Sequence, residues 1–126
     1  RFYFYDNGIL SLFLVDKPSA LLENAVAVYL KRRYGDEVYY FKSKQTGIDI
    51  DFYLPEENCA IQVAYNLETS EDRETKSLLS FVTKTEGVKR LIIVTNEEER
   101  IIPKGDLTIE VIPVYKFIME TLSDRS

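Results

Sequence analysis

Apolar and polar residues alternate in two neighbouring stretches near the middle of the chain. In Ile48–Leu54 every second residue is a large apolar one, and the same period of two returns in Cys59–Asn66. A period of two places successive side chains on opposite faces of a strand. Pro55 and the three polar residues after it separate the two stretches and are typical of a turn. The pattern predicts two adjacent strands joined as a hairpin.

Each of these strands is expected to have an apolar face and a face with polar or small residues. In the first strand the two faces are Ile48, Ile50, Phe52 and Leu54, and Asp49, Asp51 and Tyr53. In the second strand they are Ile61, Val63 and Tyr65, and Ala60, Gln62 and Ala64. The two faces with Asp51 and Gln62 are then expected to lie side by side.

Helix signals occur before, between and after the predicted strands. Pro18 suits the first turn of a helix that ends before Gly35, and Thr69 or Ser70 suits an N-cap followed by acidic residues. Together with the apolar spacing, these signals predict helices over residues 20–34, about 70–84 and 115–122. A short aromatic strand over Phe2–Tyr5 and a short helix over Ile9–Val15 are also predicted.

The remaining strand signals complete the fold class. They predict strands over Val38–Lys42, Leu107–Ile112 and the continuous apolar run Arg90–Thr95. The charged residues Glu97–Arg100 are predicted to form a loop. The order predicts one α/β domain with a central mixed sheet flanked by helices. The helix over residues 20–34 is expected to cover one face of the sheet, and the helix over residues 70–84 to cover it too.

Composition narrows the chemistry of this domain. With 126 residues the chain is the size of one domain. It has no histidine and a single cysteine, Cys59, which excludes catalytic triads with histidine, histidine-ligated zinc and an intramolecular disulfide. The groups that remain available for catalysis or binding are carboxylates, lysines, hydroxyls and backbone groups.

Charge is negative overall but unevenly distributed. The formal net charge is −5, which does not favour nucleic-acid binding through the global field. Residues 31–44 nevertheless hold five basic and two acidic side chains. The candidate nucleic-acid contacts are therefore Lys31, Arg32, Arg33, Lys42 and Lys44. The alternative is an ordinary solvated surface.

The chain carries no apolar run near the ~20 residues that span a bilayer, and no targeting motif. A cytoplasmic protein without a membrane partner is expected. Because the sequence opens on a strand-like stretch that begins at Arg1, residues 1–126 are expected to be a single domain cut from a larger protein.

One carboxylate stands out on the first long helix. Glu23 falls inside a wide apolar arc of residues 20–34, where a carboxylate is costly unless it is paired or binds a cation. Glu23, Asp51 and Gln62 are therefore expected to converge on a small polar pocket above the sheet, with space left by Ala60 and Ala64. The alternatives are a boundary glutamate that reaches water and a solvated outer face of the sheet.

Four segments resemble a known family: Arg1–Ile9, Leu21–Asn24, Ile48–Phe52 and Ala60–Val63. They resemble the C-terminal domain of unknown function of prokaryotic AAA-type ATPases, which is similar to the PD-(D/E)XK nuclease superfamily. The resemblance implies a restriction-endonuclease-like fold with an αβββαβ core and an ATP-binding parent protein. It also implies that Glu23 and Asp51 are the metal-binding carboxylates and that Gln62-Val63-Ala64 stands at the (D/E)-x-K strand.

The chain departs from the resembled family at that strand. Gln62 replaces a carboxylate and Ala64 replaces the lysine that positions or activates the attacking water. The degenerate site Glu23, Asp51, Gln62 and Ala64 is expected to be inactive, with no required cofactor and at most weak Mg²⁺ binding by Glu23, Asp51 and Gln62. Asp49, Arg73 and Glu74 are further candidate site residues.

The expected function follows from this departure. A nuclease-like domain without catalysis would act as a binding or docking module whose partners are the upstream ATPase domain, nucleic acid or another protein. One alternative is a weak Mg²⁺-dependent DNA or RNA nuclease with a displaced lysine, for which Lys42, Lys44 and Lys76 are candidates. A purely structural lid or oligomerisation domain is another.

Overall fold

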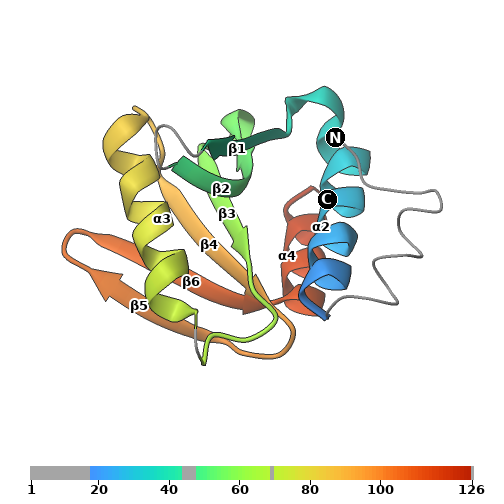
Figure 1. Ribbon diagram of the computed structural model, residues 1–126. Helices are drawn as coiled ribbons and strands as arrows, with labels where there is room; N and C mark the ends of the chain where they lie inside the picture. Colours follow the sequence, from blue (N-terminus) through green and yellow to red (C-terminus); the bar gives the residue numbers. More distant parts are fainter. Residues whose placement is uncertain (1–17, 44–47, 69, 126) are drawn as a thin grey trace.

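A six-stranded mixed sheet forms the centre of the computed structural model, which describes residues 18–43, 48–68 and 70–125 (Figure 1). The strands are β1 (Tyr39–Ser43), β2 (Ile48–Leu54), β3 (Cys59–Val63), β4 (Arg90–Thr95), β5 (Arg100–Lys104) and β6 (Leu107–Pro113). Their spatial order is β1-β2-β3-β4-β6-β5. The first three strands are antiparallel, β3, β4 and β6 run parallel, and β5 returns antiparallel at the far edge.

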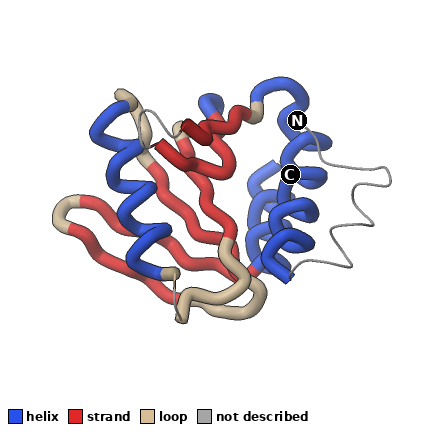
Figure 2. The backbone as a smooth tube through the Cα atoms, in the orientation of Figure 1, coloured by secondary structure: helices blue, strands red, loops and turns tan. Residues whose placement is uncertain are grey.

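Helices cover both faces of this sheet (Figure 2). The helices are α2 (Pro18–Tyr34), α3 (Glu71–Lys84) and α4 (Val114–Arg125), with short 3-10 turns at Gly35–Glu37 and Pro55–Glu57. Leu30 of α2 and Phe117 of α4 belong to one buried cluster, whereas Leu78 and Phe81 of α3 belong to another. The expectation that α3 covers the same face as α2 is wrong, because α3 packs on the opposite face.

The predicted hairpin is present, and its turn has a local cause. The chain leaves the 3-10 turn through Asn58, which takes a left-handed conformation with φ 53°. Asparagine tolerates that region better than most residues. The Asn58 carbonyl then accepts hydrogen bonds from the N–H groups of Lys89 and Arg90. The turn between β2 and β3 is thereby tied to the start of β4.

One strand breaks the expected alternation. Tyr39 pairs with Tyr53, but Phe41 pairs with Ile50, so β2 holds one residue more than β1 between these two pairs. Such a bulge turns the following side chains to the other face. Ile50 accordingly packs in the cluster under α3, whereas Phe52 packs in the cluster under α2. The prediction that Ile50 and Phe52 share a face is wrong.

One strand was not predicted. Arg100–Lys104 forms β5 at an edge of the sheet. Arg100, predicted as the last residue of the loop Glu97–Arg100, is therefore the first residue of this strand. Pro103 lies within this strand, and proline is tolerated at a sheet edge because a missing N–H costs no ladder bond there. The predictions over Phe2–Tyr5 and Ile9–Val15 lie outside the described residues.

Candidate functional site

Side chains replace the backbone ladder where β2 and β3 separate. The paired register of these strands runs from Leu54–Cys59 to Phe52–Ile61. At the next position the Asp51 N–H donates to Gln62 Oε1 at 2.7 Å, and the Val63 N–H donates to Asp51 Oδ2 at 2.8 Å. The two side chains thus satisfy buried backbone N–H groups that the ladder leaves open.

Glu74 of α3 completes this group of buried polar side chains. Gln62 Nε2 donates to Glu74 Oε1 at 2.7 Å, and Arg73 Nη2 lies 3.1 Å from Glu74 Oε2. Asp51, Gln62 and Glu74 are each less than a tenth exposed. We call these three residues the buried network. Buried carboxylates need hydrogen-bond donors or counter-charges, and here the backbone, the amide and the arginine supply them.

Chemistry fixes the orientation of the Gln62 amide. A backbone N–H can only donate and a carboxylate can only accept, so the amide oxygen must face Asp51 N–H and the amide nitrogen must face Glu74. Gln62 therefore links the end of β3 to the first turn of α3. A glutamate at this position would bring two carboxylates together instead.

The structure brings together part of the predicted site. Asp51 and Gln62 are in contact as expected, but they are buried and do not form a solvated outer face. Glu74, a secondary candidate in the sequence, is their partner. The sequence feature that indicates the burial of Glu74 is its spacing of four and seven residues from Leu78 and Phe81, which places the three on the buried side of α3.

Glu23 and Ala64 lie in different surroundings. Glu23 is half-buried on α2, the helix on the face opposite α3, and its convergence with Asp51 stays a prediction. Ala64 is buried in the cluster that contains Leu78 and Phe81, so α3 occupies the space expected above the small residues of β3. A lysine at position 64 would have to enter this apolar cluster.

Of the three candidate lysines, Lys76 is the one whose side chain the structure describes. Lys76 is exposed and follows the buried Glu74 by two positions, which is about 200° around a helix. It therefore points away from the buried network. Lys42 pairs in register with Asp49 across β1 and β2, and Lys44 lies outside the described residues.

The basic end of α2 is partly neutralised. Lys31 Nζ lies 3.0 Å from Asp36 Oδ1, and both side chains are largely exposed. Arg32 is exposed, whereas Arg33 is half-buried and donates from Nε to the Tyr34 hydroxyl at 3.1 Å. Nucleic-acid contact by these residues stays a prediction.

The buried network, as arranged, does not fit a magnesium ion. Mg²⁺ prefers oxygen ligands in near-octahedral geometry, yet Gln62 presents an N–H to Glu74, and Asp51 Oδ2 accepts from a backbone N–H. Within residues 18–43, 48–68 and 70–125, no group of three or more histidine, cysteine, aspartate or glutamate side chains is placed to hold a metal. A cation would first have to displace the Gln62 amide.

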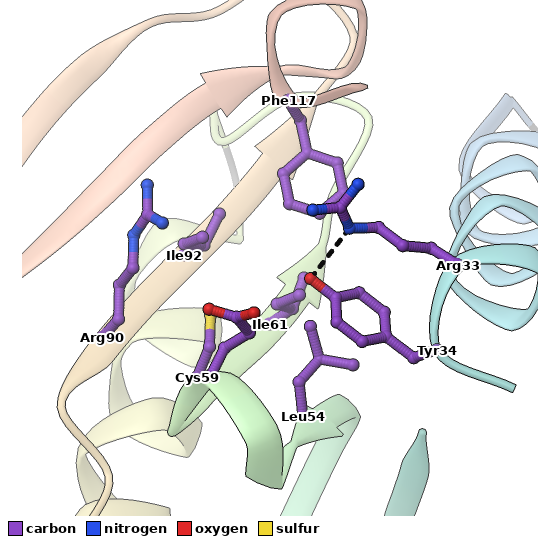
Figure 3. Close-up of a pocket in the computed structure, with 9 residues that line it drawn as sticks. Arg33, Tyr34, Leu54, Cys59, Ile61, Arg90, Ile92 and Phe117 are labelled. Atoms are coloured by element: carbon purple, nitrogen blue, oxygen red, sulfur yellow. Dashed lines mark hydrogen bonds between the residues drawn. The ribbon is translucent and has the colours of Figure 1, made fainter. Parts of the chain in front are cut away.

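A small pocket of about 50 Å³ lies elsewhere, on the face that α2 and α4 cover (Figure 3). Arg33, Tyr34 and Glu57 contribute its polar lining, and Cys59 and Phe117 contribute to its apolar lining. Burial raises the pKa of Tyr34, although the hydrogen bond from Arg33 opposes this shift. Burial also raises the pKa of the Cys59 thiol to about 12, which disfavours the nucleophilic thiolate at neutral pH.

The fold and the site together define a class of protein: an α/β domain with a mixed sheet between helices and a buried carboxylate–amide network at the end of β3. The comparison with known families is more specific. The family model described as "Domain of unknown function (DUF4143)" matches residues 19–117. The chain belongs to this family. No curated protein and no solved structure matches the chain. Among the described helices, none has the length and apolar character to cross a membrane.

Proposed function

We propose that this chain is a restriction-endonuclease-like domain of the PD-(D/E)XK type that has lost catalysis and serves an AAA-type ATPase as a C-terminal binding or docking module. The resemblance of its segments to that ATPase domain supports the parent. The order α2-β1-β2-β3-α3-β4 supports the fold, since it reproduces the αβββαβ core that the resemblance implies.

The Gln62 amide carries the proposal that catalysis is lost. In an active site of this type, carboxylates would face a metal and a lysine would face the attacking water. Here the amide at the corresponding position bonds to Asp51 N–H and Glu74 instead. Ala64, at the lysine position, is buried among apolar side chains. These side chains join the end of β3 to α3, and Ala64 itself offers no group that could activate a water.

Cleavage assays test this proposal directly. Plasmid and single-stranded DNA are incubated with the chain and with Mg²⁺ or Mn²⁺, beside Asp51→Ala as the matched control. We expect no cleavage by either protein. Metal-dependent cleavage by the unmodified chain that Asp51→Ala abolishes would contradict the proposal and favour a displaced lysine, with Lys42 or Lys44 as the first candidates.

A restored site gives the complementary experiment. Gln62→Glu with Ala64→Lys returns the missing carboxylate and lysine, and metal affinity is measured by calorimetry beside the parent chain. Metal binding gained by the double variant would support a degenerate nuclease site. A folded double variant that binds Mn²⁺ no better than the parent would argue against that ancestry.

The docking half of the proposal has its own test. The chain is titrated separately with the ATPase domain of its own full-length protein and with fluorescent DNA and RNA at low salt. Binding to the ATPase domain supports docking, and binding to a polynucleotide that weakens steeply with salt supports nucleic-acid retention. Binding to none of them would leave a structural role and overturn the proposed module.

A further inference from the structure

The small pocket on the face that α2 and α4 cover has one basic and one acidic side chain in its lining that are not paired with each other. Arg33 lies near the end of α2, and Glu57 ends the 3-10 turn Pro55–Glu57. Across the described ranges 18–43, 48–68 and 70–125, neither side chain forms an ion pair. Both charges are therefore available to a ligand that enters the pocket.

Tyr34 holds the Arg33 guanidinium in place at the pocket (Figure 3). Arg33 Nε donates to the Tyr34 hydroxyl at 3.1 Å, and Arg33 Cζ lies 5.4 Å from the centroid of the Tyr34 ring. This hydrogen bond uses one of the five N–H donors of an arginine. Burial and the charge of Glu57 raise the pKa of Tyr34 above its ordinary 10.0, so the hydroxyl keeps its proton at neutral pH and can donate it. The pocket thus offers several donors to an anionic group.

The rest of the lining is either paired or apolar. Arg90 donates from Nε and Nη2 to the two carboxylate oxygens of Glu110, at 2.8 and 3.0 Å. The other lining residues belong to the buried core, and they are Leu54, Cys59, Ile61, Ile92 and Phe117. A cavity of about 50 Å³ holds roughly four water-sized groups. A ligand enclosed there is limited to about the size of glycine or alanine.

We propose that this pocket binds a small zwitterionic amino acid, with its carboxylate at Arg33 and Tyr34 and its ammonium group at Glu57. Glu57 would repel an anion and Arg33 would repel a cation, whereas a ligand that carries both charges is attracted by both side chains. The apolar floor accepts the aliphatic carbon atoms of the ligand. The inference goes beyond the proposed function and does not depend on it.

Titration of the ¹⁵N-labelled chain with L-alanine, followed by NMR spectroscopy, tests this site. The backbone amide signals of Tyr34 and Cys59 report on the pocket. Propionate and ethylamine are the matched probes, because propionate is alanine without its ammonium group and ethylamine is alanine without its carboxylate. Calculated from the shifts, the Kd of each probe is compared with that of L-alanine.

Two pairs of variants assign the charges. Arg33→Met and Glu57→Gln each remove one charge from the pocket, and their controls are Arg32→Met and Glu56→Gln, which alter exposed neighbours outside its lining. Arg33 is half-buried, so Arg33→Met could disturb folding. Glu57 is exposed, and Glu57→Gln keeps the test independent of that variant.

We expect L-alanine to bind with a Kd in about the millimolar range, roughly tenfold more tightly than propionate or ethylamine. Arg33→Met and Glu57→Gln should each weaken alanine binding about tenfold, since each removes a charge-assisted hydrogen bond. The two control variants should bind alanine as the parent does. Glu57→Gln should also bind propionate more tightly than the parent does, because the repelling carboxylate is gone.

Three results would overturn the proposal. The first is the absence of shifts at Tyr34 and Cys59 with L-alanine up to about 100 mM. The second is equal affinity for alanine and propionate, which would mark a general anion site. The third is a loss of alanine binding that is as large in Glu56→Gln as in Glu57→Gln.

Discussion

At the scale of single residues, Gln62 is the group that lets two buried carboxylates share one end of the sheet. Its oxygen accepts from Asp51 N–H while its nitrogen donates to Glu74. Arg73 adds a positive charge to the second Glu74 oxygen from a largely exposed position. Each member of the buried network thus has a hydrogen-bond partner or a counter-charge within the protein.

Replacing Gln62 with glutamate should therefore destabilise the fold. Gln62→Glu would face Glu74 with a second carboxylate and remove the donor, and we expect a loss of about 3 kcal/mol in the free energy of unfolding near neutral pH. Urea unfolding measures it. Proximity would raise the pKa of one of the two carboxyls in the folded state, so the lost stability should return as pH falls.

The double variant Gln62→Glu with Glu74→Gln is the matched control. It exchanges donor and acceptor across the same contact, and it should recover most of the lost free energy. A Gln62→Glu chain as stable as the parent would contradict the role assigned to the amide. So would a double variant no more stable than the single one.

Cys59 offers a second test, at alkaline pH. Burial raises its pKa from the ordinary 9.0 to about 12 in the folded chain, so the folded state holds the thiol proton more tightly than the unfolded state. This contribution to stability is complete below pH 9 and is lost as pH rises toward 12. The parent should lose more stability than Cys59→Ala across that range, as measured by unfolding.

Thiol labelling checks the same burial. The folded chain should react with a disulfide reagent far more slowly at pH 8 than the urea-unfolded chain does, because the thiolate is the reactive form. Rapid labelling of the folded chain would show that Cys59 is accessible and would contradict its burial.

Strand periodicity in the sequence predicts the site residues that lie on β2 and β3, but not the contact that a helix adds to them. The period of two placed Gln62 opposite Ile61 and Val63, and the contact of Gln62 with Asp51 followed from the hairpin. Glu74 was a candidate site residue, but its pairing with Gln62 does not follow from strand periodicity. Its helix could pack on either face of the sheet, and only the face it takes brings Glu74 to Gln62.

At the scale of elements, two loops beyond the ends of β3 and β4 are joined by one acidic side chain. The Leu67 N–H donates to Glu98 Oε1 at 2.7 Å, and the Thr95 hydroxyl donates to the Glu98 carbonyl at 2.8 Å. Leu67 is buried. Glu98 therefore positions the connection between β3 and α3 against the connection between β4 and β5.

Removing this acceptor should weaken the loop connection. Glu98→Ala leaves the buried Leu67 N–H without a partner, and we expect a loss of about 1–3 kcal/mol in the free energy of unfolding. Glu98→Gln keeps a side-chain oxygen that can accept from the Leu67 N–H, so it should lower the free energy of unfolding by less than Glu98→Ala does. Hydrogen exchange at Leu67 should accelerate in Glu98→Ala alone. Equal exchange in the two variants would contradict the assignment.

Most elements could be predicted because hydrophobic periodicity and end signals agreed. Helix α2 ends at Tyr34 because Gly35 takes φ +62°, a conformation that glycine adopts at little cost. Strand β5 was not predicted because Pro103 and charged residues interrupt its short apolar run. The bulge in β2 was not predicted because it depends on how β2 pairs with β1. The local sequence pattern of residues 48–54 carries no information on that pairing.

At the scale of the whole molecule, the arrangement predicts a fold that does not depend on metal. The buried network satisfies its carboxylates with hydrogen bonds and Arg73. Removal of divalent ions with a chelator should therefore shift Tm by less than about 1 °C, because a ligand that binds weakly adds little stability at ordinary concentrations. Thermal unfolding with the chelator and with added Mg²⁺ measures this.

The restored variant Gln62→Glu with Ala64→Lys is the comparison for that experiment. If three acidic side chains then surround one site, Mg²⁺ should raise its Tm by several degrees. A large loss of Tm when the unmodified chain is treated with the chelator would contradict a metal-independent fold and would call for the ligands to be located.

The separation of β2 from β3 also gives this protein an internal spectroscopic reporter. The Val63 N–H is held by the carboxylate of Asp51 and not by a main-chain carbonyl, so the resonance of one amide proton senses the charge of one buried side chain. A downfield Val63 signal that moves upfield on acid titration, while its neighbours in β3 stay in place, would reveal the protonation of Asp51 inside the folded molecule.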